Sequence, residues 1–400
     1  MIYLDNAATT KPSPSLAALF ERHITNEWFN PSAMYPPAVS AERDLRQARD
    51  FLCGILRADG ALFNSCGTEG ANTVIFKGWR KQGGKKLHFI TTAYEHPCVY
   101  EAFAELKKEG HRVDFLNPGP DGSVHPEQLA PLICPETALV SIMHVNNETG
   151  AINDIAALSA AVKQKNPGAV FHSDGVQGFL KVPFDMAASQ VDYYTASAHK
   201  IHGLKGTGAL FYRKGAPLKA YLMGGGQEGA LRSGTENTFG ILAFAQAARE
   251  YLDGHAEKIA HMRALQAQLR QDLMQIPGTV CITPEHCAPH ILNLAFPGMR
   301  GEVLLHLLAV SYTHLHMLLW KIFFTFEICQ KLNQKQHLFR DAVFLSHSAY
   351  FLTFGLKITE AKKPKTTAAV MPPAVAITPP VKMPIAPFSA TCSMTPFASE

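Results

Sequence analysis

Ala169-Val170-Phe171-His172-Ser173-Asp174 is a short apolar run that ends on an acid, and Ser197-Ala198-His199-Lys200 closes a later run on a lysine. Short apolar runs of this kind are typical of buried strands in a parallel sheet, whose carboxyl ends gather ligands. A cofactor held by a Schiff base requires such a lysine, and a pyridine ring that must stay protonated requires a carboxylate against its nitrogen. Asp174 and Lys200 together indicate pyridoxal phosphate.

Helical patterns alternate with short apolar runs throughout residues 40–309. This alternation predicts an α/β fold in which a mainly parallel sheet is flanked by helices, joined to a smaller, here incomplete, α+β domain. We expect the large domain at residues 15–255 and the small domain at residues 1–14 and 256–309. The predicted strands are residues 87–91, 113–116, 138–144, 170–173, 193–196 and 209–212, and the predicted helices are residues 39–55, 69–82, 97–109, 155–165 and 240–275.

The charge of the chain does not point to nucleic acid. The 400 residues are 47% hydrophobic, which is ample for a large core, and their net charge is +4. Residues 1–309 hold 28 Lys and Arg against 29 Asp and Glu, so the basic balance comes wholly from the last 91 residues. We therefore expect no nucleic-acid partner.

The eight cysteines are scattered without CxxC pairs, so neither a disulfide framework nor a metal site is indicated. The start of the chain, Met1-Ile2-Tyr3-Leu4-Asp5-Asn6, has no basic region followed by an apolar stretch, which argues against a signal peptide. No uninterrupted apolar run approaches the ~20 residues of a membrane helix. These features predict a cytoplasmic protein that does not associate with membranes.

Polar motifs lie in five loops, most of them directly after a predicted strand. Taken singly, each is typical of a helix cap, a turn or a solvated charge. Taken together, they fall where the carboxyl ends of parallel strands meet, and they include a Gly-Thr turn before a helix that is suited to hold a phosphate. The sequence therefore predicts one ligand site built from Gly67, Thr68, His96, Asn147, Asp174, Gln177, Ser197, His199 and Lys200.

Six ordered blocks make this chain resemble a cysteine desulfurase of the class V aminotransferase family, over about residues 1–309. The resemblance implies the fold of the pyridoxal phosphate-dependent transferases. The blocks are Ser65-Cys66-Gly67-Thr68-Glu69, Glu95-His96-Pro97, His144-Val145-Asn146-Asn147-Glu148-Thr149-Gly150, His172-Ser173-Asp174-Gly175-Val176-Gln177, Ser197-Ala198-His199-Lys200 and Arg232-Ser233-Gly234-Thr235-Glu236-Asn237.

The resemblance implies a role for each residue around the cofactor ring. Lys200 would form the Schiff base and His96 would stack on the ring, so these two are the catalytic candidates. Asp174 would pair with the pyridine nitrogen. Gln177 and Asn147 would form hydrogen bonds near the phenolic oxygen.

The resemblance also implies how the cofactor phosphate is held. Gly67, Thr68, Ser197 and His199 would bind it within one chain. Thr235 would reach the phosphate of the neighbouring subunit, so a homodimer is implied. No metal ligand is implied.

The reaction that the resemblance implies removes sulfur from L-cysteine to give L-alanine and an enzyme persulfide. The sulfur would pass to an acceptor or iron–sulfur scaffold protein for the synthesis of iron–sulfur clusters or thio-modified cofactors. In the family, a cysteine in a small-residue loop attacks the sulfur, and counting on from Gly301-Glu302 places that loop at about residues 319–325. This segment contains no cysteine, and the nearest thiol, Cys329, lies among bulky residues. We expect this form of the chain to be inactive.

Two alternatives remain open at this point. One is a selenocysteine lyase or another class V β-lyase, and the other is a catalytically silent, cofactor-binding scaffold protein. Only one of the 29 glycines, Gly355, lies in residues 310–400, which contain a Phe-rich stretch and then a Pro-rich one. We expect this tail to be largely disordered and to come from a chimeric or frameshifted gene, with a divergent extension or a regulatory tail as the other interpretations.

Overall fold

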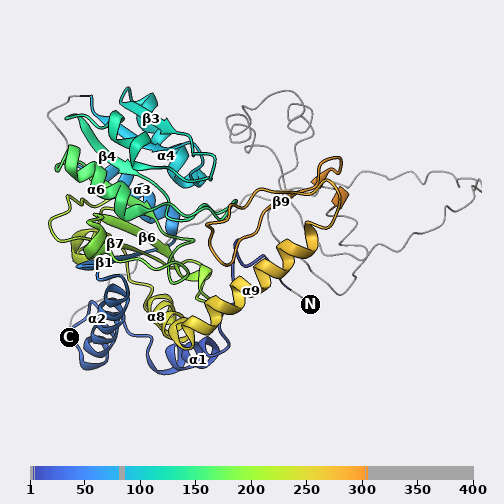
Figure 1. The fold of residues 1–400 in the computed structure, drawn as a ribbon. Helices are drawn as coiled ribbons and strands as arrows, with labels where there is room; N and C mark the ends of the chain where they lie inside the picture. Colours follow the sequence, from blue (N-terminus) through green and yellow to red (C-terminus); the bar gives the residue numbers. More distant parts are fainter. Residues whose placement is uncertain (1–2, 4, 81–85, 302, 305–400) are drawn as a thin grey trace, which may run out of the picture. The chain divides into compact units, whose positions relative to one another are not determined.

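Seven strands form one sheet in the computed structural model, which describes residues 3, 5–80, 86–301 and 303–304. The strand order is β1-β7-β6-β5-β4-β2-β3 (Figure 1). Strands β6, β5, β4, β2 and β3 run parallel to one another, and β7 runs antiparallel to both of its neighbours. The strands are β1 Gly60–Asn64, β2 His88–Thr92, β3 Arg112–Leu116, β4 Thr137–Ser141, β5 Val170–Asp174, β6 Tyr193–Ser197 and β7 Gly208–Tyr212.

Helices cover both faces of this sheet because consecutive strand residues point to opposite faces. In β1, for example, Leu62 packs into a cluster with the residues of α3 and α4, whereas Ala61 and Phe63 pack against α2 and α8. The described helices are α1 Leu16–Asn26, α2 Pro36–Leu56, α3 Gly67–Lys77, α4 Pro97–Lys108, α5 Pro126–Leu129, α6 Ile155–Lys165, α7 Met186–Ser189, α8 Thr238–Leu252 and α9 His255–Leu273, with short 3-10 turns η1 Ala130–Leu132, η2 Ala198–Lys200 and η3 Gln227–Ala230.

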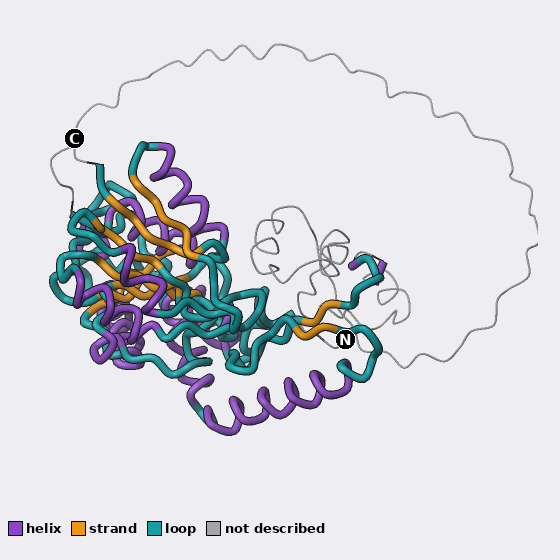
Figure 2. Tube along the Cα trace, turned by 45° about the horizontal axis from the view of Figure 1, so that its top comes forward, coloured by secondary structure: helices purple, strands orange, loops and turns teal. Residues whose placement is uncertain are grey.

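A second, two-stranded sheet lies apart from the first (Figure 2). It pairs β8 (Val280–Cys281) with β9 (Leu294–Ala295) and follows the long helix α9. All described residues belong to one compact unit, so the predicted division into large and small domains stays a prediction. None of the helices in the described part of the chain has the length and apolar character of a membrane span.

The structure corrects several of the predicted elements. The helix expected at residues 69–82 begins at Gly67 and ends at Lys77. The helix expected at residues 240–275 is two helices, because Gly254 adopts a left-handed φ of 58° between them. The strand β1 was missed. The strand expected at residues 209–212 is β7, which runs antiparallel to both of its neighbours in the otherwise parallel sheet. The strand expected to reach residue 144 ends at Ser141.

Candidate active site

A cavity of about 500 Å³ lies where the carboxyl ends of β1, β2, β4, β5 and β6 meet. Five loops from distant parts of the chain contribute its walls, as the sequence predicts. Nine of the ten predicted site residues line this cavity: Gly67, Thr68, His96, Asn147, Asp174, Gln177, Ser197, His199 and Lys200. The structure places them together, and their individual roles remain predictions.

The loop from β1 to α3 supplies the anion-binding geometry. Cys66 is the N-cap of α3, so the backbone N–H groups of the first helical turn point out of the helix end. A Cβ on Gly67 would lie 2.7 Å from Cγ2 of Val176, so only glycine fits between this loop and the loop after β5. Thr68 is exposed at the same helix end. This helix end is therefore suited to hold a phosphate beside the Thr68 hydroxyl.

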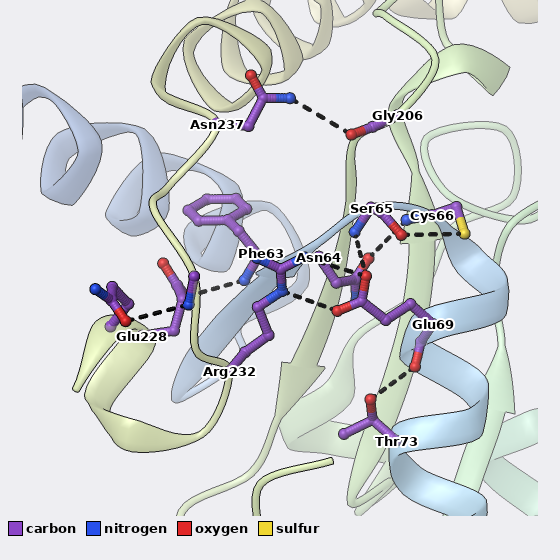
Figure 3. Close-up of polar contacts among 12 residues, drawn as sticks. Phe63, Asn64, Ser65, Cys66, Glu69, Thr73, Gly206, Glu228, Arg232 and Asn237 are labelled. Atoms are coloured by element: carbon purple, nitrogen blue, oxygen red, sulfur yellow. Dashed lines mark hydrogen bonds and ion pairs between the residues drawn. The ribbon is translucent and has the colours of Figure 1, made fainter. Parts of the chain in front are cut away.

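The segment that contains Thr235 is tied to this helix by a half-buried ion pair (Figure 3). Arg232 donates from Nε to Oε1 of Glu69 at 2.9 Å, and Glu69 also accepts from the backbone N of Ser65 at 2.8 Å. Thr235 itself is exposed and is absent from the lining of the cavity in this chain. It is the one predicted site residue that a single chain does not bring to the cavity.

Asp174 is the last residue of β5 and is only 5% exposed. Its Oδ1 accepts from the backbone N of Val176 at 2.9 Å, which fixes the carboxylate at the strand end. Burial raises the pKa of the Asp174 carboxyl, and the positive charges of His96 and Lys200 act in the opposite direction. A buried acid at a strand end, facing a cavity, is the partner that a protonated pyridine nitrogen requires.

Lys200 ends the 3-10 turn η2 that follows β6. Its Nζ donates to the backbone oxygens of Ala7 at 2.5 Å and of Ala8 at 2.8 Å, so the N-terminal segment forms part of the site. His199 beside it is within hydrogen-bond distance of Oγ1 of Thr9 at 3.0 Å. Burial, together with the charges of Lys200, Lys181 and Lys205, lowers the pKa of His199 to about 4, so this imidazole is neutral at pH 7.

The two neighbouring asparagines after β4 have different roles, one in shaping the turn and the other in lining the cavity. Oδ1 of Asn146 accepts from the backbone N of Glu148 at 2.9 Å and of Thr149 at 2.7 Å, and this shapes the turn. Asn147 lines the cavity instead. His96 also lines the cavity, and its Nδ1 atom accepts from the backbone N of Cys98 at 3.2 Å and caps α4.

Several cavity residues were missed by the sequence reasoning. Asp5, Ala7, Ala8 and Cys98 line the cavity, and so does His290, which comes from the segment between α9 and β9. The small side chains of the N-terminal segment carry no chemical signal of their own, since they contribute through backbone oxygens. His290 has no motif around it, so only the tertiary structure could find it.

The residues present fit pyridoxal phosphate. The cavity joins a lysine amine, a buried carboxylate and the open N-terminus of a helix. The Oγ atom of Ser197 is buried without a hydrogen-bond partner in the described structure, and it lies at the cavity edge where a phosphate oxygen would satisfy it. No group of three or more potential metal ligands is found among the described residues.

A mainly parallel α/β sheet with this set of groups at one edge defines a pyridoxal phosphate-dependent enzyme. The model of the aminotransferase class-V family matches residues 2–316 of this chain. Among curated proteins, a NifS/IcsS protein homolog of Lactobacillus delbrueckii subsp. bulgaricus is 40% identical over 315 residues, which cover 77% of this chain and 81% of the relative. A cysteine desulfurase of Nostoc sp. is 37% identical and is covered over 76% of each chain.

Solved structures agree with the sequence relatives. A NifS-like protein superposes with a TM-score of 0.76 at 32% identity, over 86% of this chain and 90% of that one. The chain belongs to the aminotransferase class-V family. The family, the fold class and the cofactor that the sequence predicts are thereby confirmed. The predicted cysteine loop at residues 319–325 and Cys329 lie outside the described residues.

Proposed function

We propose that this chain is a pyridoxal phosphate-dependent cysteine desulfurase that takes sulfur from L-cysteine and leaves L-alanine. The observation that carries the proposal is the meeting of Asp174 and Lys200 in one cavity, at the ends of the neighbouring strands β5 and β6. Relatives described as cysteine desulfurases support the predicted class of enzyme, a transferase of sulfur-containing groups.

The cofactor, when bound, supplies an electron sink for a negative charge at the substrate α-carbon. Lys200 would hold it covalently and would carry a proton to and from the reacting carbon. Asp174 would keep its negative charge against the pyridine nitrogen, and the helix α3 would hold the phosphate. His96 would restrict the ring from one side of the cavity.

The names of the relatives favour desulfurase chemistry over the two alternatives, a selenocysteine lyase or other β-lyase and a silent scaffold protein. The attack of a cysteine thiol on the substrate sulfur would involve the segment at about residues 319–325, which lies outside the described part of the chain. We keep the proposal that this form lacks that step, and that a restored family C-terminus would deliver sulfur to an acceptor or iron–sulfur scaffold protein.

A homodimer is part of the proposal, and two features support it. Thr235 is exposed and does not line the cavity of its own chain, as we expect of a residue that serves a partner's cavity. The α1–α2 region exposes large apolar side chains, with Trp28 63% and Met34 97% exposed, and monomeric proteins rarely leave such residues uncovered together. We further propose that the protein works in the cytoplasm, without nucleic acid or membrane partners.

The full chain tests the first half of the proposal. Reconstitution with pyridoxal phosphate should give a visible absorption band, and L-cysteine should change this band at lower concentration than L-serine does. Replacing residues 310–400 by the corresponding segment of the Nostoc relative should then allow alanine release. A chain that shows no cofactor band would rule out the proposed function, whereas a band without alanine release from the hybrid would point to the silent scaffold.

A further inference from the structure

His290 reaches the cavity from outside the predicted motifs and contacts a predicted cofactor ligand. Its Nε2 atom lies 3.0 Å from Oε1 of Gln177, whose Nε2 donates to the backbone oxygen of Ala7 at 2.8 Å. The oxygen of Ala7 can only accept, so the amide nitrogen of Gln177 must face it and the amide oxygen must face His290. It follows that the proton of His290 sits on Nε2.

The imidazole of His290 is neutral. Burial lowers the pKa of His290 well below its ordinary value, and the charges of Lys181 and Lys200 lower it further. The single ring proton is needed at Nε2 for the bond to Gln177, so Nδ1 is unprotonated. This Nδ1 atom is buried and has no hydrogen-bond partner in the described structure. The orientation of the ring is therefore set by Gln177 and by the loop that carries His290.

That loop is held firmly against the rest of the site. Gln266 on α9 donates to the backbone oxygen of Ala288 at 2.9 Å, and the backbone N of Ala288 donates to the oxygen of Gly150 at 2.8 Å. Ile291 packs into a buried cluster with Val145. The loop is thus attached to the turn that carries Asn147, and His290 has little freedom to move away from Gln177.

We propose that His290 is a positioning residue that fixes the amide of Gln177, so that the second N–H of its Nε2 faces the cavity. One N–H of this nitrogen is used by Ala7, and the second is then available to the phenolic oxygen of the cofactor. This inference rests on the proposed function, because it assumes that the cavity takes pyridoxal phosphate.

The test compares variants of the full chain by cofactor affinity and by the pH at which the absorption band of the bound cofactor titrates. His290→Phe keeps a ring but removes the donor, and it should weaken cofactor binding about three- to tenfold. A donor to the phenolic oxygen favours its ionised form, so the band of His290→Phe should titrate at higher pH. His290→Gln retains an N–H near the same place and should restore both values.

Two controls separate positioning from a general structural effect. His286, exposed on the same loop, should tolerate His286→Phe with no change in either measurement. In a Gln177→Ala background, adding His290→Phe should change nothing further, because the side chain through which His290 acts is gone. Thermal melting of the cofactor-free variants checks that each one folds.

Additive effects of the two substitutions, or a His290→Phe variant with unchanged affinity and titration, would overturn the inference. If His290→Phe fails to fold, the pair His290→Gln and Gln177→Ala still decides: a His290→Gln variant with the properties of Gln177→Ala would refute it. If the chain without substitutions does not bind pyridoxal phosphate, the proposed function is refuted instead.

Discussion

Asp174 and Glu95 are two buried carboxyl groups near the cavity, and burial raises the pKa of both. Burial and the nearby charge of Asp174 together raise the pKa of Glu95 to about 8. The Oε1 atom of Glu95 accepts from the backbone N of Met143 at 2.7 Å and from the hydroxyl of Thr92 at 3.0 Å, so this group serves the loop after β4. Asp174 is the group that faces His96 and Lys200. The surroundings of the two acids therefore assign Asp174 to the cavity and Glu95 to the loop after β4.

Replacing Asp174 by Asn should therefore be far more harmful than replacing Glu95 by Gln. In a hybrid with the family C-terminus restored, Asp174→Asn should lower the rate of alanine release over a hundredfold, which corresponds to ~3 kcal/mol or more of lost stabilisation at the developing negative charge. Glu95→Gln preserves an oxygen acceptor and should cost less than tenfold. The measurement is the steady-state rate of alanine release at saturating L-cysteine for both variants. Near-normal activity of Asp174→Asn would exclude Asp174 as the partner of the pyridine nitrogen.

Lys200 should be the lysine that carries the cofactor. Borohydride reduction of the reconstituted chain should fix the cofactor covalently, and Lys200→Ala should abolish this fixation because no other amine replaces it. Lys181→Met is the matched control, since Lys181 is the buried lysine whose charge acts on Lys200's neighbours, and it should retain fixation. Mass spectrometry of the reduced peptide gives the answer. A reduced adduct in Lys200→Ala would assign the Schiff base to another lysine.

The turn between β5 and α7 contains a buried lysine, Lys181. Lys181 is 4% exposed, and its Nζ has no hydrogen-bond partner among the described residues. Burial lowers the pKa of Lys181 from its ordinary 10.5 to about 7, and the charge of Lys200 contributes. The turn therefore holds a group that disfavours folding when it is protonated, and this gives the element a stability that depends on pH.

The sign of this dependence follows from where the proton resides. Between pH 7 and 10.5 the unfolded chain keeps the proton of Lys181 and the folded chain releases it, so raising the pH through this window stabilises the folded chain. Lys181→Met should be more stable than the parent by about 2 kcal/mol or more at pH 7, and the difference should shrink by pH 9.5. Urea unfolding of the cofactor-free proteins at both pH values measures it.

Lys163 is the control for this measurement. Its Nζ lies 2.5 Å from Oδ2 of Asp192, so it is a half-buried lysine with a partner. Lys163→Met should destabilise the protein at both pH values, because it leaves a buried carboxylate without one of its two cationic partners. Equal stability of Lys181→Met and the parent at pH 7 would contradict the account given for Lys181.

Thr235 connects the site to the assembly of two chains. If it serves the cavity of the partner, Thr235→Val should weaken cofactor binding about tenfold, the value of one hydrogen bond to a charged phosphate. A mixed dimer of Thr235→Val and Lys200→Ala chains contains one complete cavity, made of Lys200 from the first chain and Thr235 from the second. Cofactor fixation on the Thr235→Val chain at limiting cofactor should therefore rise when the two are co-expressed. No rise in the mixed dimer would place Thr235 in its own chain's site.

Local patterns in the sequence predicted several helices and strands correctly. The helix at residues 155–165 was predicted with the bounds that α6 has, and five predicted strands overlap β2, β3, β5, β6 and β7 within one residue at each end. The motifs at strand ends also predicted nine of the cavity residues. These features are decided by apolar periodicity and by the rule that carboxyl ends of parallel strands share an edge, and both rules act over short distances or depend only on strand direction.

Contacts between distant segments were decided by the tertiary structure alone. The backbone oxygens of Ala7 and Ala8 accept from Lys200, and His290 contacts Gln177, although each pair is more than a hundred residues apart in the sequence. Neither a backbone oxygen nor an isolated histidine has a pattern in sequence that announces such a contact. Their positions result from the packing of elements that lie far apart in the sequence, which no local pattern specifies.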